Sequence, residues 1–331
     1  MAISKQAVLA GLVERLQRML DSGEIPPWQK PWTPQFGPHS APFNPVTGKR
    51  YAGLNRIDLA LSGALAGYTD PRWMGYRQAA EQGWQVRAGE RAAPIHLPVE
   101  RSRNRHREDG EPDRVREADS GRDAQQVYLV FKRVPVFNAA QIDGIPPLTP
   151  VPRERVPARS EELETIGRQM GVQITEAPRD RAAYFPDRDC IELPPRAAFA
   201  DQYGYDGTKA HELAHATGHG SRLKRELGGA FGSLPYASEE ITAEVGSFLI
   251  CQELGIPHPG GNPDLSTEQH AAYLASWASV LRDDPKAVGA ALDRGVKAAE
   301  YLARQRERTR ECEPVRSPVP ERADIDLDLP G

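Results

Sequence analysis

The sequence has few cysteines and no long hydrophobic run, and each scarcity excludes a class of protein. Three cysteines occur in 331 residues, Cys190, Cys251 and Cys312. Because they are odd in number and far apart, they predict no disulfide framework and favour a reducing compartment, the cytoplasm. The first twenty residues are amphipathic and charged, unlike a signal peptide, and no segment is apolar for long enough to cross a membrane. We therefore expect a cytoplasmic protein without a membrane partner.

The net charge is also small, with a formal value of −4 for the whole chain. The charge is unevenly distributed, because residues 1–150 contain 20 Lys and Arg against 16 Asp and Glu, which leaves the remainder acidic. A proline-rich stretch at residues 145–152 separates the two parts. A mildly basic part joined to an acidic part is a modest sign that the first part contacts nucleic acid.

The length of the chain predicts two domains. We expect an α+β fold with a first domain at residues 1–145, a linker at 146–160 and a mostly helical second domain with a small sheet at 161–305. A charged, low-complexity insert at residues 100–126 and a Pro- and Asp-rich tail at 306–331 are expected to be disordered.

The most specific pattern is the motif His211-Glu212-Leu213-Ala214-His215, which has the form H-E-x-x-H. On a helix the two histidines lie one turn apart on the same face and can bind one zinc ion, while Glu212 lies beside them. Candidate N-caps at Asp206 and Thr208 and a candidate stop at Gly218 predict such a helix. A third histidine in metzincin spacing is excluded, because Ser221 occupies that position.

A second predicted helix supplies the candidate for the third ligand. Within residues 238–249 the apolar positions follow helical spacing, with Ile241, Val245, Phe248 and Leu249 on one face. Glu240 adjoins that face and we predict it as the third ligand, with Glu244, one turn on, orienting a ligating histidine. Glu239 and Glu244 remain alternatives for the third ligand. A solvated acidic face is the alternative without function.

A zinc ion in such a site supports metal-assisted hydrolysis, with Glu212 as the catalytic general base. A peptide is the expected substrate. Residues 183–185 and 190–193 predict two short strands around a turn, and an exposed strand edge near the metal could pair with an extended peptide. No residue is assigned to stabilise the oxyanion, although Tyr236 and His219 are candidates by proximity in sequence.

Aromatic and basic residues are interleaved in the first part of the chain. Single-stranded nucleic acid is typically held by aromatic faces that stack on bases and by Lys and Arg that contact phosphates. We predict contacts of this kind for Trp28, Lys30, Trp32, Lys49, Arg50, Tyr51, Asn55, Arg56 and Lys132. The alternative is that tryptophans here are core residues, first of all Trp73 and Trp84.

Taken together, these segments resemble a known family. Residues 27–32, 44–55, 73–78 and 136–141 are similar to the N-terminal domain of ArdC-type antirestriction proteins, which plasmids and related mobile elements encode. Residues 211–219, 238–248 and 270–277 are similar to the zincin-like metallopeptidase domain of the same proteins. The resemblance implies that the first domain binds single-stranded DNA and that the protein protects incoming DNA from host restriction.

Two hypotheses follow from the resemblance. In the first, bound DNA is shielded and the zinc site mainly holds the second domain together. In the second, the protein is an active DNA-targeted metalloprotease that cleaves restriction enzymes or other DNA-bound proteins.

Overall fold

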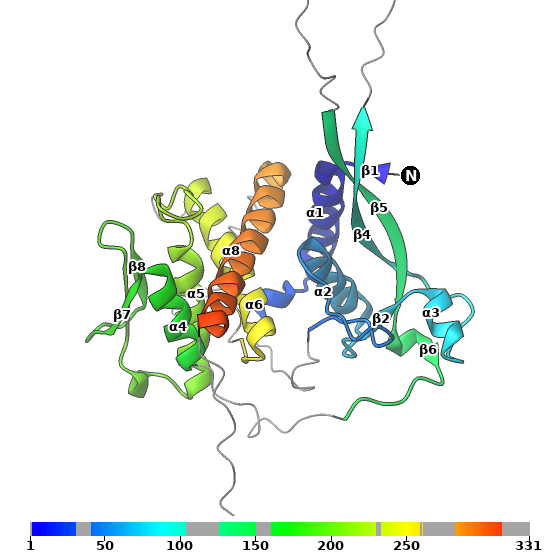
Figure 1. The fold of residues 1–331 in the computed structure, drawn as a ribbon, viewed down its shortest axis with the longest axis horizontal. Coiled ribbons are helices and arrows are strands. Elements are labelled where there is room, and N and C mark those ends of the chain that lie inside the picture. Colours follow the sequence, from blue (N-terminus) through cyan, green and yellow to red (C-terminus); the bar gives the residue numbers. More distant parts are fainter. Residues whose placement is uncertain are drawn as a thin grey trace, which may run out of the picture.

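The computed structural model describes residues 2–30, 41–103, 126–149, 160–229, 233–258, 260 and 282–312. Within them, two groups of elements stand side by side (Figure 1). The first group has a long antiparallel sheet covered by helices, and the second is mostly helical with a small sheet. This arrangement confirms the predicted α+β class. No helix in the described part of the chain is long and apolar enough to cross a membrane.

The first group is built on a ladder between β4 (Ala93–Arg103) and β5 (Gln126–Asn138). These strands pair antiparallel from Ala93↔Val136 to Arg103↔Gln126. Short strands β1 (Ala2–Ile3) and β2 (Trp73–Met74) also pair with β5. Helices α1 (Lys5–Asp21) and α2 (Leu54–Ala66) lie against this sheet (Figure 1). The ladder extends beyond the helices, because the side chains of β4 are buried from Ala93 to His96 and exposed from Leu97 to Arg101.

Smaller elements complete the first group. They are the 3-10 helix η1 (Pro27–Gln29), α3 (Tyr76–Glu81), β3 (Gln85–Val86), the 3-10 helix η3 (Ala139–Gln141) and β6 (Ile142–Asp143). Strands β3 and β6 pair with each other and form a separate two-stranded sheet.

The second group begins with α4 (Ser160–Met170) and a sheet of order β7-β9-β8, formed by β7 (Gln173–Glu176), β8 (Ala183–Phe185) and β9 (Cys190–Leu193). The antiparallel pairing of β8 with β9 confirms the two strands predicted around a turn. The short 3-10 helix η5 (Arg196–Ala198) then leads into the helices that hold the metal site.

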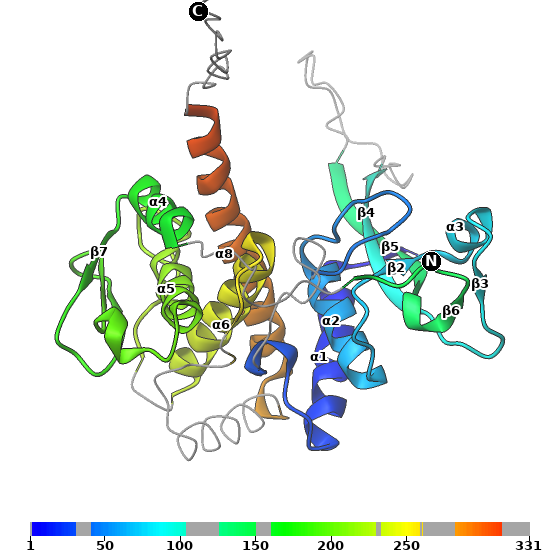
Figure 2. The same cartoon turned by 90° about the horizontal axis from the view of Figure 1, so that it is seen from below.

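Those helices are α5 (Gln202–Ala216), α6 (Leu234–Leu254) and α8 (Pro285–Cys312). Helix α6 packs between α5 and α8 and is buried along nearly its whole length (Figure 2). Glycines allow this close approach, because a Cβ at Gly295 of α8 would lie 2.7 Å from the side chain of Val245. Helix α8 also continues to Cys312, past the predicted start of the tail at residue 306.

One hydrophobic core joins the two groups. The first group contributes Leu12, Leu16, Trp28 and Ile57, and the second contributes Ile241, Val245, Phe248 and Leu292. Helix α8 contacts both α1 and α2 as well as α4, α5 and α6. This core therefore contains residues from both sides of the predicted domain boundary. Most of the predicted insert, linker and tail (residues 104–125, 150–159 and 313–331) and the similarity at residues 270–277 lie outside the described residues.

Candidate metal centre and nucleic-acid interface

The H-E-x-x-H motif lies on α5, as its spacing predicts. The helix begins earlier than the candidate caps suggest, because the side chain of Asp201 accepts a hydrogen bond from the amide of Gly204 at 2.9 Å. Asp206, predicted as a cap, is instead buried inside the helix and accepts a hydrogen bond from Gln202 at 2.8 Å. The helix ends at Ala216, close to the predicted stop.

The structure brings together the three side chains that we predict as metal ligands. Donor atoms of His211, His215 and Glu240 all lie within 4.8 Å of one another. The two Nε2 atoms are 3.1 Å apart, and the carboxylate oxygens of Glu240 lie 3.7 Å from Nε2 of His211 and 3.6 Å from that of His215. Ligand atoms of a tetrahedral zinc site are expected about 3.3 Å apart, since zinc–nitrogen bonds are about 2.0–2.1 Å. The donor set therefore fits a divalent metal ion, and ligation by these residues stays a prediction.

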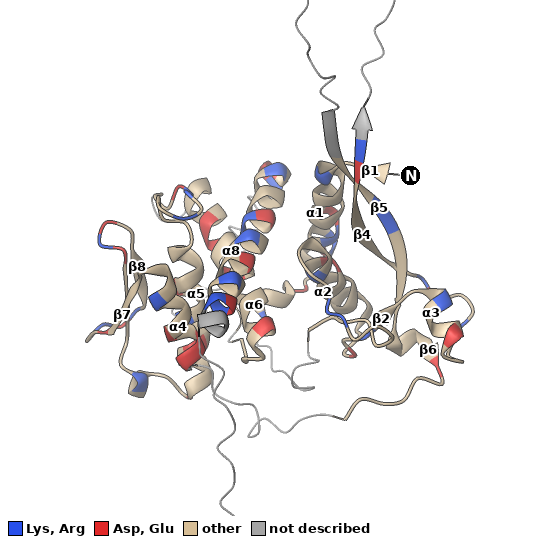
Figure 3. Ribbon diagram, viewed as in Figure 1, with Lys and Arg blue, Asp and Glu red and all other residues tan. Residues whose placement is uncertain are grey.

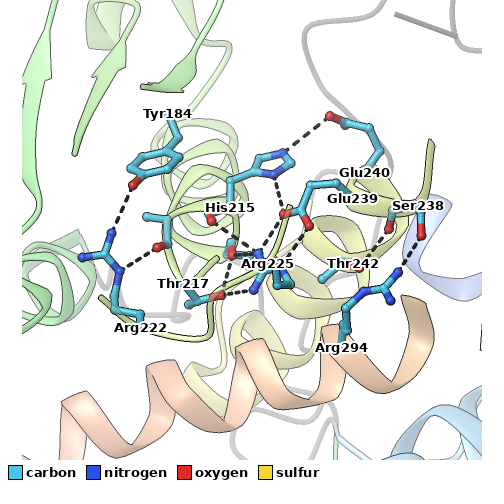
Figure 4. Close-up of polar contacts among 12 residues, drawn as sticks. Tyr184, His215, Thr217, Arg222, Arg225, Ser238, Glu239, Glu240, Thr242 and Arg294 are labelled. Carbon is cyan, nitrogen blue, oxygen red and sulfur yellow. Dashed lines mark hydrogen bonds and ion pairs between the residues drawn. The ribbon is translucent and has the colours of Figure 1, made fainter. Parts of the chain in front are cut away.

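The other imidazole nitrogen of His215 is held by Glu239. Nδ1 of His215 lies 3.1 Å from Oε1 of Glu239, and Arg225 grips the same carboxylate with Nε and Nη2 at 2.9 and 2.7 Å (Figure 4). Burial alone would raise the pKa of Glu239, but His215 and Arg225 hold it below its ordinary value. We predicted that Glu244 orients the ligating histidine, and for His215 this is corrected, because Glu239 makes the contact.

Arg225 reaches this position because the chain folds back over the end of α5. Its guanidinium also donates to the hydroxyl of Thr217 at 2.7 Å and to the carbonyl of Ala214 at 2.8 Å. A Cβ at Gly218 would lie 2.4 Å from Cδ2 of Leu227 and 2.9 Å from Nη2 of Arg225, so any larger residue there would displace both side chains. Gly218 therefore leaves room for the residue that supports Glu239.

Glu244 is fully buried and contacts the first part of the chain. It accepts a hydrogen bond from Nε2 of Gln29, which is 2% exposed and belongs to η1. Glu244 is also among the groups that raise the pKa of His211. The metal centre therefore includes a side chain from the part of the sequence that we assigned to DNA binding.

His211 is enclosed by carboxylates. Burial by itself lowers the pKa of His211, but Glu240, Glu212 and Glu244 outweigh that effect and raise it to about 9. A bound cation would neutralise the negative charge that these carboxylates concentrate around the buried imidazole.

The predicted general base, Glu212, is 6% exposed, and its Oε2 accepts a hydrogen bond from the amide of Tyr184 at 2.7 Å. Tyr184 lies on β8, an edge strand of its sheet among the described strands, so the edge predicted to pair with a peptide is adjacent to the motif. Of the two oxyanion candidates, Tyr236 hydrogen-bonds to Glu240. His219 instead contacts Ser221 at 2.8 Å.

Several residues predicted to bind DNA are committed to other contacts. Trp28 is fully buried in the core between the two groups, and Arg56 is 9% exposed and donates to the carbonyl of Leu249 at 3.1 Å and to Glu253 at 2.8 Å. Asn55 exchanges hydrogen bonds with the backbone of His96. These three predictions are corrected, because burial leaves Trp28 no face for a base and pairing occupies the polar groups of the other two.

The remaining candidates differ in exposure. The hydroxyl of Tyr51 donates to the carbonyl of Trp73, and Arg50 pairs with Glu253 at 3.2 Å. Lys30 is partly exposed near Glu24, Lys49 and Lys132 are exposed, and Trp32 lies outside the described residues.

The same architecture occurs in a solved structure. The chain aligns with the crystal structure of the antirestriction ArdC protein from plasmid R388 in its metal-free form, with 31% identity and a TM-score of 0.66. The alignment covers 91% of this chain and 98% of that one. The chain belongs to the ArdC antirestriction family.

Further comparisons agree with this assignment. Residues 5–137 match the model of the N-terminal domain of anti-restriction factor ArdC, and residues 161–294 match a zincin-like metallopeptidase model. The Mn(II)-bound structure of the R388 protein aligns with 32% identity and a TM-score of 0.61 over 90% of this chain and 97% of that one.

Two DNA primases named TraC from Escherichia coli are 41% and 42% identical over 88% and 86% of this ArdC-family chain. The chain spans only 19% and 26% of their lengths. An uncharacterized protein, y4eC, from Sinorhizobium fredii (strain NBRC 101917 / NGR234) is 33% identical over 84% of this chain and 86% of its own length.

The residues that sequence reasoning missed are those whose contacts span large distances in sequence. Arg225 meets Glu239 across 14 residues, and Gln29 meets Glu244 across 215. No local spacing predicts either pair in this ArdC-family chain. Gly218, just after the motif, is the one local sign of the Arg225 contact, because a glycine there indicates that another segment of the chain passes close to the end of α5.

Proposed function

We propose that this ArdC-family chain is an antirestriction protein of a mobile element. In the proposal it binds single-stranded DNA through its N-terminal part in the cytoplasm and carries one zinc ion in its metallopeptidase-like part. It thereby protects incoming DNA from host restriction. The observation that carries the proposal is the likeness to the R388 antirestriction protein over nearly the whole length of both chains.

The metal proposal rests on the donor set. Two imidazoles and one carboxylate are typical of zinc, and the solved relative that contains a metal contains Mn(II), so the ligands are compatible with a divalent ion. When bound, zinc lowers the pKa of a water molecule and polarises a carbonyl group. Purified protein is expected to hold one zinc ion per chain, measured by elemental analysis. His211→Ala should lose the metal, whereas Glu212→Gln should keep it; metal retained at full content by His211→Ala would contradict the assignment.

A second candidate function is an active protease that DNA directs to restriction enzymes or other DNA-bound proteins. A structural zinc site is usually closed by four protein ligands, and three donor residues gather here among the described residues. Glu212 supports the candidate further, since its carboxylate can take a proton from water and pass it to the leaving amine. The amide of Tyr184 fixes Oε2 of Glu212 and so orients the carboxylate.

The DNA proposal is tested by binding of a fluorescent oligothymidylate to the full chain, compared with a duplex of the same length. The single strand should bind at least tenfold more tightly. Equal affinity for the two, or no affinity for either, would contradict the proposal.

A further inference from the structure

A basic groove lies between the helices and the sheet of the N-terminal part. It has a volume of about 650 Å³ and is lined by residues of α1, α2, the loop before β4, and β5. Four arginines face it, Arg15 and Arg18 from α1, Arg91 from the loop, and Arg133 from β5. Lys and Arg on α1 and β5 are visible in Figure 3.

Three of these arginines carry charge that the described residues do not neutralise. Arg15 pairs with the fully buried Asp58 at 2.6 Å, which fixes one cation at the floor of the groove. Arg18, Arg91 and Arg133 form no ion pair with any residue that the structure describes. Asp58 is also close enough to Arg133 for the charge of that arginine to lower the pKa of Asp58, but one carboxylate cannot balance the four cations.

The one carboxylate on the rim does not cancel this charge. Glu90 is held by Arg87 at 2.9 Å, and its other oxygen accepts a hydrogen bond from Gln141 at 2.9 Å. Burial lowers the pKa of Arg15 most and Asp58 raises it, but the charges of Arg18 and Arg133 lower it further, so these guanidinium groups repel one another. Clustering like charges costs free energy that a bound anion recovers.

An aromatic side chain lies beside the cations. Tyr68 lines the groove and is half-buried, and its ring meets that of the buried Trp73 edge to face, with centroids 6.1 Å apart and an interplanar angle of 62°. Trp73 therefore supports the ring of Tyr68 next to the arginines. Arginines that contact phosphates around a supported ring that stacks on a base are the usual elements of a single-strand site.

We propose that this groove holds the backbone of single-stranded DNA, with Arg18, Arg91 and Arg133 on phosphates and Tyr68 stacked on a base. The inference rests on the proposed DNA binding and moves the contacts away from Trp28, Asn55 and Arg56. The volume is within the range of pockets for small ligands, which admits a short stretch of one strand and not a duplex. Lys132 lies outside this site, because neighbouring residues of a strand point to opposite faces and Arg133 points into the groove.

The test measures affinity of the full chain for a fluorescent oligothymidylate over a series of salt concentrations. The double variant Arg18→Ala/Arg133→Ala removes two exposed cations that support no described ion pair, and Arg77→Ala, an exposed arginine on α3 outside the groove, is the matched control. The double variant should bind at least tenfold more weakly. Its slope of log K against log salt should fall by about 1.4, because each lost phosphate contact contributes about 0.7 for single strands.

A second variant separates stacking from charge. Tyr68→Ala should weaken binding about fivefold or more with an unchanged salt slope, whereas Tyr68→Phe should bind as wild type. Thermal melting and metal content of every variant verify that the fold is retained.

The outcomes distinguish the groove from the proposed function. If wild type binds the oligonucleotide and the double variant has the affinity and slope of Arg77→Ala, the groove is the wrong site, although DNA binding stands. If wild type binds no single strand, the proposed function and the groove fail together.

Discussion

The imidazole of His215 is held at Nδ1, which leaves Nε2 to bind a metal ion. Glu239 holds Nδ1, which turns Nε2 toward His211 and Glu240. Arg225 in turn holds both oxygens of Glu239. Since such supporting contacts orient a ligand and raise its basicity, we expect metal affinity to depend on a residue that never touches the ion.

Arg225→Ala should therefore lower the affinity for zinc by about tenfold to a hundredfold, as loss of an outer contact typically does. The affinity is measured by competition with a chromogenic chelator. Arg179→Ala is the control, because Arg179 is exposed and pairs with Glu192, which is not among the candidate metal ligands. Unchanged zinc affinity in Arg225→Ala, with a melting temperature lowered, would show that the arginine only stabilises the fold.

His258 provides a prediction on pH. It is buried against Phe248, its Nδ1 accepts from the amide of Gly260, and its ring contacts Ser247. Burial, followed by the charge of His211, lowers its pKa to about 3. Because the ordinary value is about 6.5, its contribution to stability is fully present above pH 6.5 and is lost as the pH falls toward 3.

Between pH 7 and pH 5 this one group should remove about 2 kcal/mol from the free energy of unfolding. Denaturant unfolding of metal-free wild type and His258→Gln, at both pH values, measures the difference. The variant should lose correspondingly less stability on acidification, and an equal loss in both proteins would show that His258 does not carry this dependence.

At the scale of elements, periodicity predicted α5, α6 and the β8–β9 pair, because each is specified by local spacing of apolar residues. The start of α5 was wrong, since Asp206 is buried by neighbouring elements that local sequence does not reveal, and Asp201 provides the cap. Local spacing favoured Glu240 as the third metal ligand over Glu239 and Glu244, and this choice stays a prediction. The contact of Glu239 with His215 and Arg225 depends on a loop that folds back, which local spacing does not reveal. The prediction that Trp28 contacts DNA was wrong for a similar reason, since its core includes residues of α6 and α8, more than 200 residues away in the sequence, as well as of α1 and α2.

The substitution Trp28→Ala tests whether Trp28 is a core residue rather than a DNA contact. Loss of a fully buried tryptophan should lower the free energy of unfolding by about 3–5 kcal/mol. Under conditions where the variant is folded, its affinity for single-stranded DNA should equal that of wild type, because the ring presents no face to solvent. Loss of DNA binding with unchanged stability would instead make Trp28 a stacking platform.

At the scale of the molecule, the two parts form one body. Residues from both contribute to one of the hydrophobic cores, Gln29 reaches Glu244, and Arg56 reaches the carbonyl of Leu249. Two family models match the two parts separately, so the sequence indicates two independent units. The packing indicates one unit instead, because a shared core joins the parts. The N-terminal part and the elements that carry the candidate metal ligands are therefore joined by side-chain contacts as well as by the chain that connects them.

Calorimetry should accordingly find one cooperative unfolding transition for the metal-free chain. Its van't Hoff and calorimetric enthalpies should agree, because the core that joins the parts takes Leu12 and Trp28 from one and Phe248 and Leu292 from the other. Trp28→Ala should shift this single transition downward. Two resolved transitions in wild type would show that the parts unfold independently.

The most direct measurement is transfer of an unmodified plasmid into a restricting recipient that expresses wild type, Glu212→Gln or Arg18→Ala/Arg133→Ala. If DNA binding protects the plasmid, Glu212→Gln should protect as well as wild type and the groove variant should not. Loss of protection in Glu212→Gln, while that variant still binds DNA and metal, would contradict this account and make proteolysis the mechanism.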